Sequence, residues 1–79
     1  MPMDIDYDKI DDCTLALLHL VASRGPCGAR AWKSFDLETL NRLQAKGYIA
    51  DLQSKSPSMV LSEQGQARAK ELFAKFFAK

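Results

Sequence analysis

Apolar residues recur at helical spacing from about Tyr7 or Asp8 to Ser23, which predicts a first helix. Asp6 or Asp8 is suited to cap its N-terminus. One apolar side of this helix consists of Ile10, Cys13, Thr14, Leu17, Leu20 and Val21. Leu15, Leu18 and Ala22 form a second apolar set roughly opposite, and His19 lies near Leu15 as a half-buried neutral side chain. Because a helix that is apolar nearly all round is buried on more than one face, we expect the rest of the chain or a second subunit to wrap it.

The segment that follows contains helix-breaking residues, Arg24-Gly25-Pro26-Cys27-Gly28. The next stretch, 29–34, is either a short strand or one and a half helical turns. We favour a short strand or extended segment with Arg30 and Trp32 on one side. Trp32 is expected to anchor the core.

A second helix is predicted from Asp36, a good N-cap, to Gly47, which supplies the positive φ often found at helix ends. Phe35 precedes the cap and can pack on Leu40 as a hydrophobic staple. The buried stripe of this helix is Leu37, Leu40 and Leu43.

Residues 48–52 and 58–61 have the composition of two short strands, and the polar segment 53–57 joins them as a turn. Ser62 is suited to cap a last helix that reaches about Phe77. The apolar stripe of this helix consists of Ala69, Leu72, Phe73, Phe76 and Phe77.

These elements predict an α+β fold that is mostly helical, in the order helix, short extended segment, helix, two-stranded β-hairpin, C-terminal helix. We expect residues 1–79 to form a single domain, with residues 1–6 as a flexible lead. The predicted core contains the following residues: Ile10, Leu17, Leu20, Trp32, Leu40, Leu43, Ile49, Leu61 and Phe73.

The charge is unevenly distributed along the 79 residues, although the net charge is only +1. Residues 1–12 carry five aspartates against Lys9, and residues 13–79 carry ten Lys or Arg against five Asp or Glu. A mildly basic body is compatible with an anionic partner. No apolar run approaches the roughly 20 residues of a membrane span, and the acidic start differs from a signal peptide. We therefore expect a cytoplasmic protein in which Cys13 and Cys27 are reduced thiols.

The residues needed for catalysis or metal binding are sparse. His19 is the only histidine, which leaves little for a nucleophile–base pair, and two cysteines with one histidine do not complete a structural metal site. Asp4, Asp6 and Asp8 imitate a calcium loop, but its glycine and glutamate positions are occupied by Lys9 and Leu15. We predict no enzyme activity, no metal, no cofactor and no small-molecule substrate.

Two short motifs carry a resemblance to a known fold. Lys46-Gly47-Tyr48-Ile49 ends a helix before a hairpin, and Leu61-Ser62-Glu63-Gln64-Gly65 opens the next helix. Residues 36–77 thus resemble the wing half of the winged helix in MarR- and PadR-type regulators. The resemblance implies a winged-helix-like domain and, as function, a DNA-binding transcriptional regulator. A full helix-turn-helix has one more helix, for which the segment 24–35 leaves no room.

The whole chain also resembles a family of short bacterial proteins of unknown function. The segments that carry this resemblance are 4–11, Asp-Ile-Asp-Tyr-Asp-Lys-Ile-Asp, and 28–36, Gly-Ala-Arg-Ala-Trp-Lys-Ser-Phe-Asp. It implies no activity.

If double-stranded DNA is the partner, six polar residues are the candidate contacts: Asn41, Arg42, Lys46, Lys55, Arg30 and Lys33. Asn41, Arg42 and Lys46 would face the groove, Lys55 would lie on the wing, and Arg30 or Lys33 would touch phosphate. Glu38 precedes Arg42 by four residues and would partly neutralise it.

The alternative function is a protein–protein interaction module without DNA binding, either a homodimer or a subunit of an assembly. The candidate dimer interface combines the second face of the first helix with the C-terminal tail: Leu15, Leu18, Leu72, Phe73, Phe76 and Phe77. In the competing arrangement, the last helix folds back across Leu15 and Leu18 and covers both surfaces within one chain.

Overall fold

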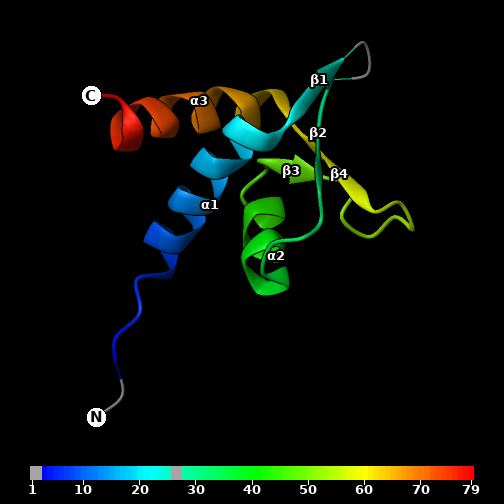
Figure 1. Ribbon diagram of the computed structural model, residues 1–79. Coiled ribbons are helices and arrows are strands. Elements are labelled where there is room, and N and C mark those ends of the chain that lie inside the picture. The colour runs from blue at the N-terminus through cyan, green and yellow to red at the C-terminus, as the bar shows by residue number, and fades with distance from the viewer. Residues whose placement is uncertain (1–2, 26–27) are drawn as a thin grey trace.

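The computed structural model describes residues 3–25 and 28–79, and Figure 1 shows the arrangement of their helices and strands. The elements in chain order are α1 (Tyr7–Val21), β1 (Ser23–Gly25), β2 (Gly28–Trp32), α2 (Leu37–Ala45), β3 (Ile49–Ala50), β4 (Ser58–Leu61) and α3 (Glu63–Phe77). The expectation of an α+β chain with helices at both ends is confirmed. The prediction that Cys27 is a reduced thiol lies outside the described residues.

Helix α1 begins where the sequence indicates, because the carboxylate of Asp6 accepts a hydrogen bond from the backbone amide of Lys9 at 3.0 Å. It ends at Val21, two residues before the predicted end, because Ala22 is extended and Ser23 already belongs to β1. Strand β1 was not predicted. It pairs with β2, so the segment after α1 is a hairpin and not only a helix break.

The sheet has four antiparallel strands in the order β1-β2-β4-β3. The prediction of a strand at 29–34 is confirmed by β2, in which Ala29 pairs with Leu61 and Trp32 with Ser58 of β4. The two-stranded hairpin is therefore wrong in extent: β4 lies inside the sheet, between β3 and β2, and β3 has only two residues.

The turn between α2 and β3 meets the start of α3. Asp36 caps α2 by accepting from the amide of Thr39 at 3.1 Å, and Gly47 follows the helix with φ +84°. The hydroxyl of Ser62 donates to the carbonyl of Gly47 at 2.6 Å and accepts from the amide of Gly65 at 2.9 Å. A Cβ on Gly65 would lie 1.9 Å from the carbonyl oxygen of Tyr48. The two short motifs of the sequence thus form one contact, which only glycine at position 65 allows without a shift.

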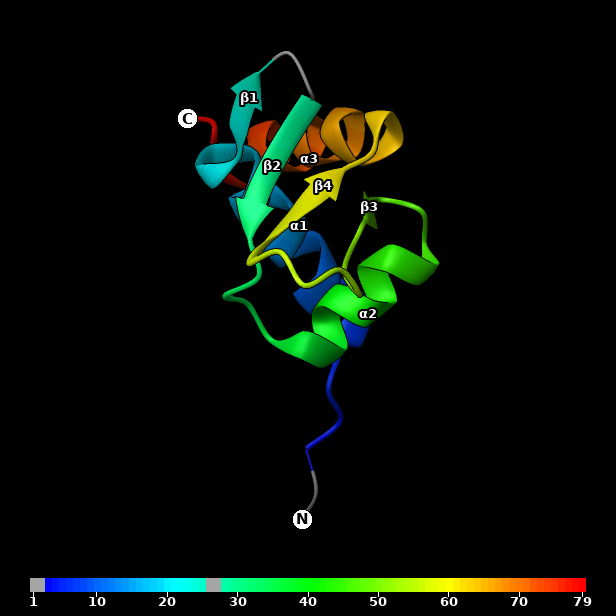
Figure 2. The same cartoon turned by 90° about the vertical axis from the view of Figure 1, so that its right-hand side faces the viewer.

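The core lies between the helices and one face of the sheet. Figure 2 shows α1 and α3 behind the sheet and α2 at its β3 side, with the other face open toward the viewer. The buried apolar side chains come from all three helices and the inner sheet face: Leu15, Ala16, Leu18, Ala29, Ala31, Leu40, Leu43, Ile49, Leu52, Met59, Leu61, Ala69 and Leu72.

The predicted core is correct for the hairpin and α3, correct in part for α2, and wrong for α1 and β2. Leu37, assigned to the buried stripe of α2, lies in its first turn and is 63% exposed. Leu40, Leu43, Ile49 and Leu61 are buried, and Phe73 packs against the core. Ile10, Leu17 and Leu20 are exposed, because α1 turns its other face, with Leu15 and Leu18, toward α3 and the sheet. Trp32 is 67% exposed and not a core anchor, because Ala29 and Ala31 take the inner side of β2.

Candidate interaction surface

A buried aspartate joins α1 to α2. The side chain of Asp11 is 1% exposed, and its two carboxylate oxygens accept from the Nε of Arg42 at 2.8 and 3.1 Å. One of them also accepts from the Nζ of Lys46 at 2.8 Å. The Arg42 guanidinium donates further to the hydroxyl of Thr39 at 3.0 Å. Two cations of α2 therefore neutralise one buried carboxylate of α1 and tie the two helices together.

The electrostatics of this network hold Lys46 in place. Its hydrogen bond to Asp11 raises the pKa of the Lys46 ammonium above its ordinary value, and the more exposed Asp8, 3.2 Å away, adds to the effect. Arg42 also lies over the ring of Tyr7, 4.9 Å from its centroid. The sequence suggested that Glu38 pairs with Arg42, but the carboxylate that does so is that of Asp11. Two of the predicted DNA contacts are thus joined to acidic residues of α1.

The remaining candidate DNA contacts lie elsewhere. Arg30 projects from the outer face of β2, donates to the hydroxyl of Ser58 at 3.0 Å and pairs with Asp51 at 3.4 Å. Lys33 donates to the carbonyl of Ser54 in the hairpin loop at 2.8 Å. Asn41 and Lys55 are exposed. The structure brings Arg30 and Lys33 to the hairpin loop and Arg42 and Lys46 to Asp11, so the six residues form separate groups.

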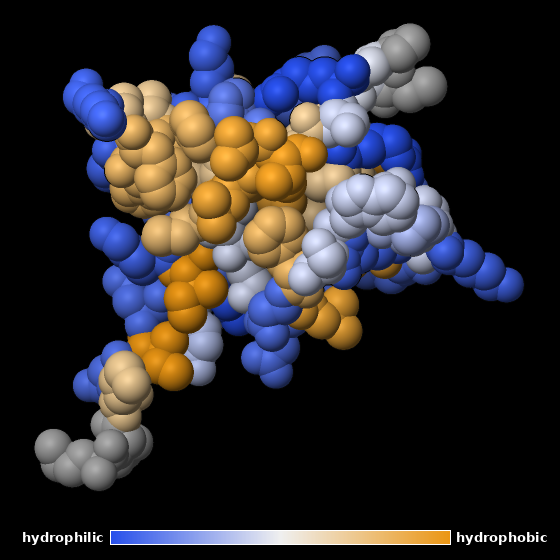
Figure 3. Space-filling model, viewed as in Figure 1, coloured by the Kyte–Doolittle hydropathy of each residue, from blue (hydrophilic) through white to orange (hydrophobic). Residues whose placement is uncertain are grey.

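The most conspicuous surface feature is an apolar stripe on α1. Its members share the side of the helix that faces away from the core, and we call them the outer stripe: Ile10, Cys13, Leu17, Leu20 and Val21. Figure 3 shows apolar surface along α1 on this side of the molecule. The first four positions have spacings of three, four and three, the pattern of a helix that packs along another helix.

The N-terminal part of the outer stripe borders a groove of about 430 Å³. The extended segment before α1 supplies Met3 and Ile5, and the loop before α2 supplies Phe35. Met3 is 81% exposed and Ile5 48%, although both are apolar. In this groove α1 and the N-terminal segment present apolar surface that the described chain leaves open.

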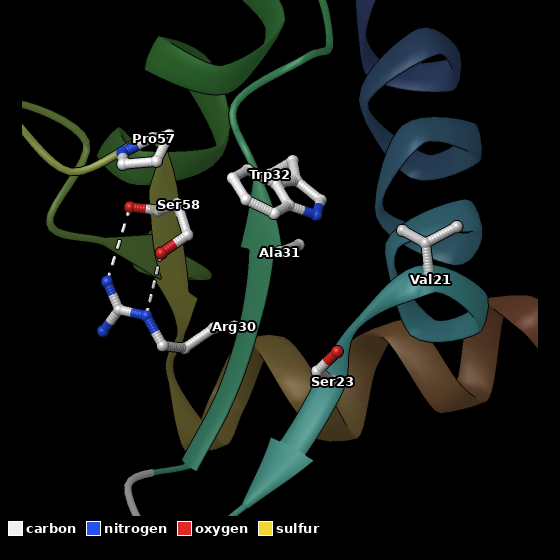
Figure 4. Close-up of a pocket in the computed structure, with 7 residues that line it drawn as sticks. All are labelled: Val21, Ser23, Arg30, Ala31, Trp32, Pro57 and Ser58. Atoms are coloured by element: carbon white, nitrogen blue, oxygen red, sulfur yellow. Dashed lines mark hydrogen bonds between the residues drawn. The ribbon is translucent and has the colours of Figure 1, made fainter.

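A second hollow lies at the other end of α1. Figure 4 shows Val21 and Trp32 on either side of this cavity, with Ser23 below them in the view. The cavity has a volume of about 190 Å³ and is also lined by Arg30 and Pro57. An exposed indole and a valine line the cavity, whereas the guanidinium of Arg30 points away from it toward Ser58.

The predicted dimer interface is in large part the interior of one chain. Leu15, Leu18 and Leu72 are fully buried, because α3 folds back over α1, which is the competing arrangement of the sequence analysis. These three side chains are therefore core residues. Phe73 and Phe76 are half-buried against the core, and Phe77 is 47% exposed.

His19 lies where the end of α1 packs against α3. Its ring lies 5.1 Å from that of Phe73, and its Nδ1 is 2.9 Å from the guanidinium of Arg24. Burial lowers the pKa of the imidazole, and the positive charges of Arg24 and Lys70 lower it further. The prediction of a half-buried histidine is in agreement with this position.

Sequence reasoning missed the outer stripe as a surface and Asp11 as a buried residue. The spacing of three, four and three was present in the sequence and could have marked the stripe as a helix-pairing seam. Asp11 gave no such signal, because a carboxylate in the first turns of a helix is ordinarily solvated.

Comparison with known proteins identifies the family. The model of the Domain of unknown function (DUF6429) matches residues 6–79, and the chain belongs to this family. It is also similar to the uncharacterized protein y4hR of Sinorhizobium fredii (strain NBRC 101917 / NGR234), with 47% identity over 77 residues. That match covers 98% of this chain and all of the relative. The expected resemblance to short bacterial proteins of unknown function is confirmed.

No solved structure matches the chain. Among the described residues, none of the helices has the length and apolar content required to cross a membrane.

Proposed function

We propose that the protein is a non-enzymatic protein-interaction module that docks through the outer stripe of α1. The observation that carries this proposal is the exposure of the stripe itself, in which Leu17, Leu20 and Val21 are 41%, 64% and 53% exposed. Single exposed apolar side chains are ordinary on proteins, whereas a contiguous stripe with polar borders marks an interaction site. The stripe belongs to one helix and therefore presents a regular surface to a partner.

The scaffold under the stripe supports this function. Asp11 is fixed between Arg42 and Lys46, and Leu15 and Leu18 on the inner face of α1 are fully buried. The helix is thus held from behind in one orientation. A surface that is already ordered loses little conformational entropy on binding, which favours its use for docking.

Photo-crosslinking in living cells of the native host tests the proposal. A photoreactive phenylalanine at position 17 should yield covalent adducts with protein, either a second copy or another chain. The matched control carries the same group at Lys70, an exposed residue of α3. The proposal fails if position 17 gives no more adduct than position 70.

DNA binding is the second candidate function. It is favoured by the order helix α2, hairpin β3–β4, helix α3, which supports the winged-helix resemblance, and by exposed Asn41 and Lys55. Against it, Arg42 and Lys46 are paired with Asp11, and β1 and β2 occupy the place of a further helix.

Fluorescence anisotropy with a random-sequence DNA duplex at low salt distinguishes the two functions. A DNA-binding protein should bind at micromolar concentration, lose affinity steeply as salt is added, and bind more weakly after Asn41→Ala or Lys55→Ala. No binding at tens of micromolar protein would end the DNA candidate and leave the interaction module untouched.

A further inference from the structure

We infer that the occupant of the outer stripe is a second copy of this chain, with the two α1 helices antiparallel about a two-fold axis near residue 15. This inference rests on the proposed function and names its partner. The register places Ile10 opposite Leu20 of the second copy and Cys13 opposite Leu17 of the second copy. Each pair then forms one layer of the seam, as expected for helices that pair through positions spaced three and four apart.

The accessible surface of the chain is larger than that of a typical monomer of its mass. It amounts to 5517 Å². A folded monomer of 8.8 kDa exposes about 4,800 Å² by the usual scaling of surface with mass. Part of the excess lies in the extended segment before α1, whose residues 3–6 are exposed, and the exposed outer stripe adds to it.

The charge distribution along α1 selects the antiparallel direction. Asp4, Asp6 and Asp8 lie before or in the first turn, whereas Arg24 follows the last turn. Parallel helices would place these acidic ends side by side. The antiparallel register places Asp6 beside Arg24 of the second copy twice in each dimer, so opposite charges meet at both ends.

The groove that borders the outer stripe fits the same arrangement. Ile10, Cys13 and Leu17 line it, and the register places these residues opposite Leu20, Leu17 and Cys13 of the second copy. The segment before α1 continues away from the body along the helix, as both Figure 1 and Figure 2 show.

Disulfide crosslinking measures the register directly. The starting protein carries Cys27→Ser, so that Cys13 is its only cysteine. In the antiparallel dimer the Cα atoms of the two Cys13 residues are offset by about 6 Å along the axis, four residues of helical rise. With a spacing between the axes of about 8–10 Å they are too far apart for a disulfide. Adding Leu17→Cys puts a thiol opposite Cys13 of the second copy, and mild oxidation should then yield a covalent dimer.

The control variant carries Cys27→Ser, Cys13→Ser and Leu17→Cys, and it should give no covalent dimer. A covalent dimer in this control, or in the starting protein, would mean parallel helices and overturn the inference. No covalent dimer in any variant would also overturn it. If position 17 still forms photo-crosslinks with other proteins in that case, the proposed function stands and only the choice of a second copy fails.

A charge exchange tests the ends of the seam. Arg24→Glu creates two like-charge contacts in each dimer and should raise the dissociation constant about tenfold at low salt, with a smaller effect at high salt. Adding Asp6→Lys puts opposite charges back at these two contacts and should restore much of the affinity. Lys55→Glu, in the hairpin loop, is the matched control and should change nothing. An equal loss for Arg24→Glu and Lys55→Glu would contradict the register.

Discussion

The two faces of α1 differ in how far the rest of the described chain covers them. The inner face carries Leu15 and Leu18, fully buried against α3 and the sheet, and Asp11, which is neutralised by two cations of α2. The outer face carries Leu17 and Leu20, which no described part of the chain covers. Both faces are apolar in sequence, but only one has partners within the fold. The inner face therefore contributes to stability, and the outer face is available for recognition.

The largest effect is expected at the buried carboxylate. Asp11→Ala leaves Arg42 and Lys46 without their shared partner and should lower the free energy of unfolding by about 3–5 kcal/mol. Asp8→Ala removes a carboxylate that contacts the same lysine but is 89% exposed, so it should cost at most about 1 kcal/mol. Urea unfolding of dilute protein measures both. Equal costs would contradict the assignment of Asp11 to the interior.

Leu17 and Leu18 are neighbours in sequence that lie on opposite faces of α1. Leu18→Ala removes a fully buried side chain and should cost about 2–5 kcal/mol. Leu17→Ala truncates a half-exposed side chain and should cost about 1 kcal/mol or less in the monomer. Urea unfolding at concentrations too low for association gives both values. If Leu17 proves as costly as Leu18, the outer face is part of the core.

Trp32 extends the comparison to the sheet. Because its indole lies on the outer face of β2, Trp32→Ala should change the free energy of unfolding of the monomer by about 0.5 kcal/mol. The matched inner-face variant is Met59→Ala on β4, which should cost about 2–5 kcal/mol, since Met59 is fully buried. Thermal unfolding followed by circular dichroism distinguishes them. A large loss for Trp32→Ala would contradict its exposed position.

The smallest effect concerns pH. The pKa of His19 is lowered in the folded protein, so at pH values just below 6.5 the unfolded chain binds more protons at this position than the folded one. Stability should therefore decrease as the pH falls below about 6.5. The difference between wild type and His19→Gln, measured by urea unfolding from pH 7.5 to 5, isolates this contribution from that of the carboxylates. A difference that stays constant over this range would show that His19 titrates normally.

The sequence predicted the part of the fold that depends on local signals. The caps Asp36 and Ser62 and the glycine at position 47 mark the ends of α2 and the start of α3, because each acts on backbone atoms within a few residues. The choice between the two faces of α1 depends on contacts across the chain. Asp11 contacts Arg42, 31 residues later, and the sequence of the first helix alone does not indicate this contact.

The prediction of which β2 residues face the core was wrong for a related reason. A strand shows one side chain to each face in turn, and a tryptophan is a stronger apolar signal than two alanines. The sequence therefore favoured Trp32 for the core, whereas β2 uses the small Ala29 and Ala31 there. The candidate site followed from these two errors: the stripe assigned to the core is the surface, and the leucines assigned to the interface are the core.

Sedimentation velocity of the wild type and of Leu17→Glu tests whether the outer face of α1 is an interaction surface occupied by a second copy. We predict that the wild type approaches twice its monomer mass of 8.8 kDa at micromolar concentration. Leu17→Glu should remain a monomer with an unchanged circular dichroism spectrum, because the substitution places a charge on the seam and leaves the core intact. A wild type that stays monomeric, or a variant that dimerises equally well, would contradict the account.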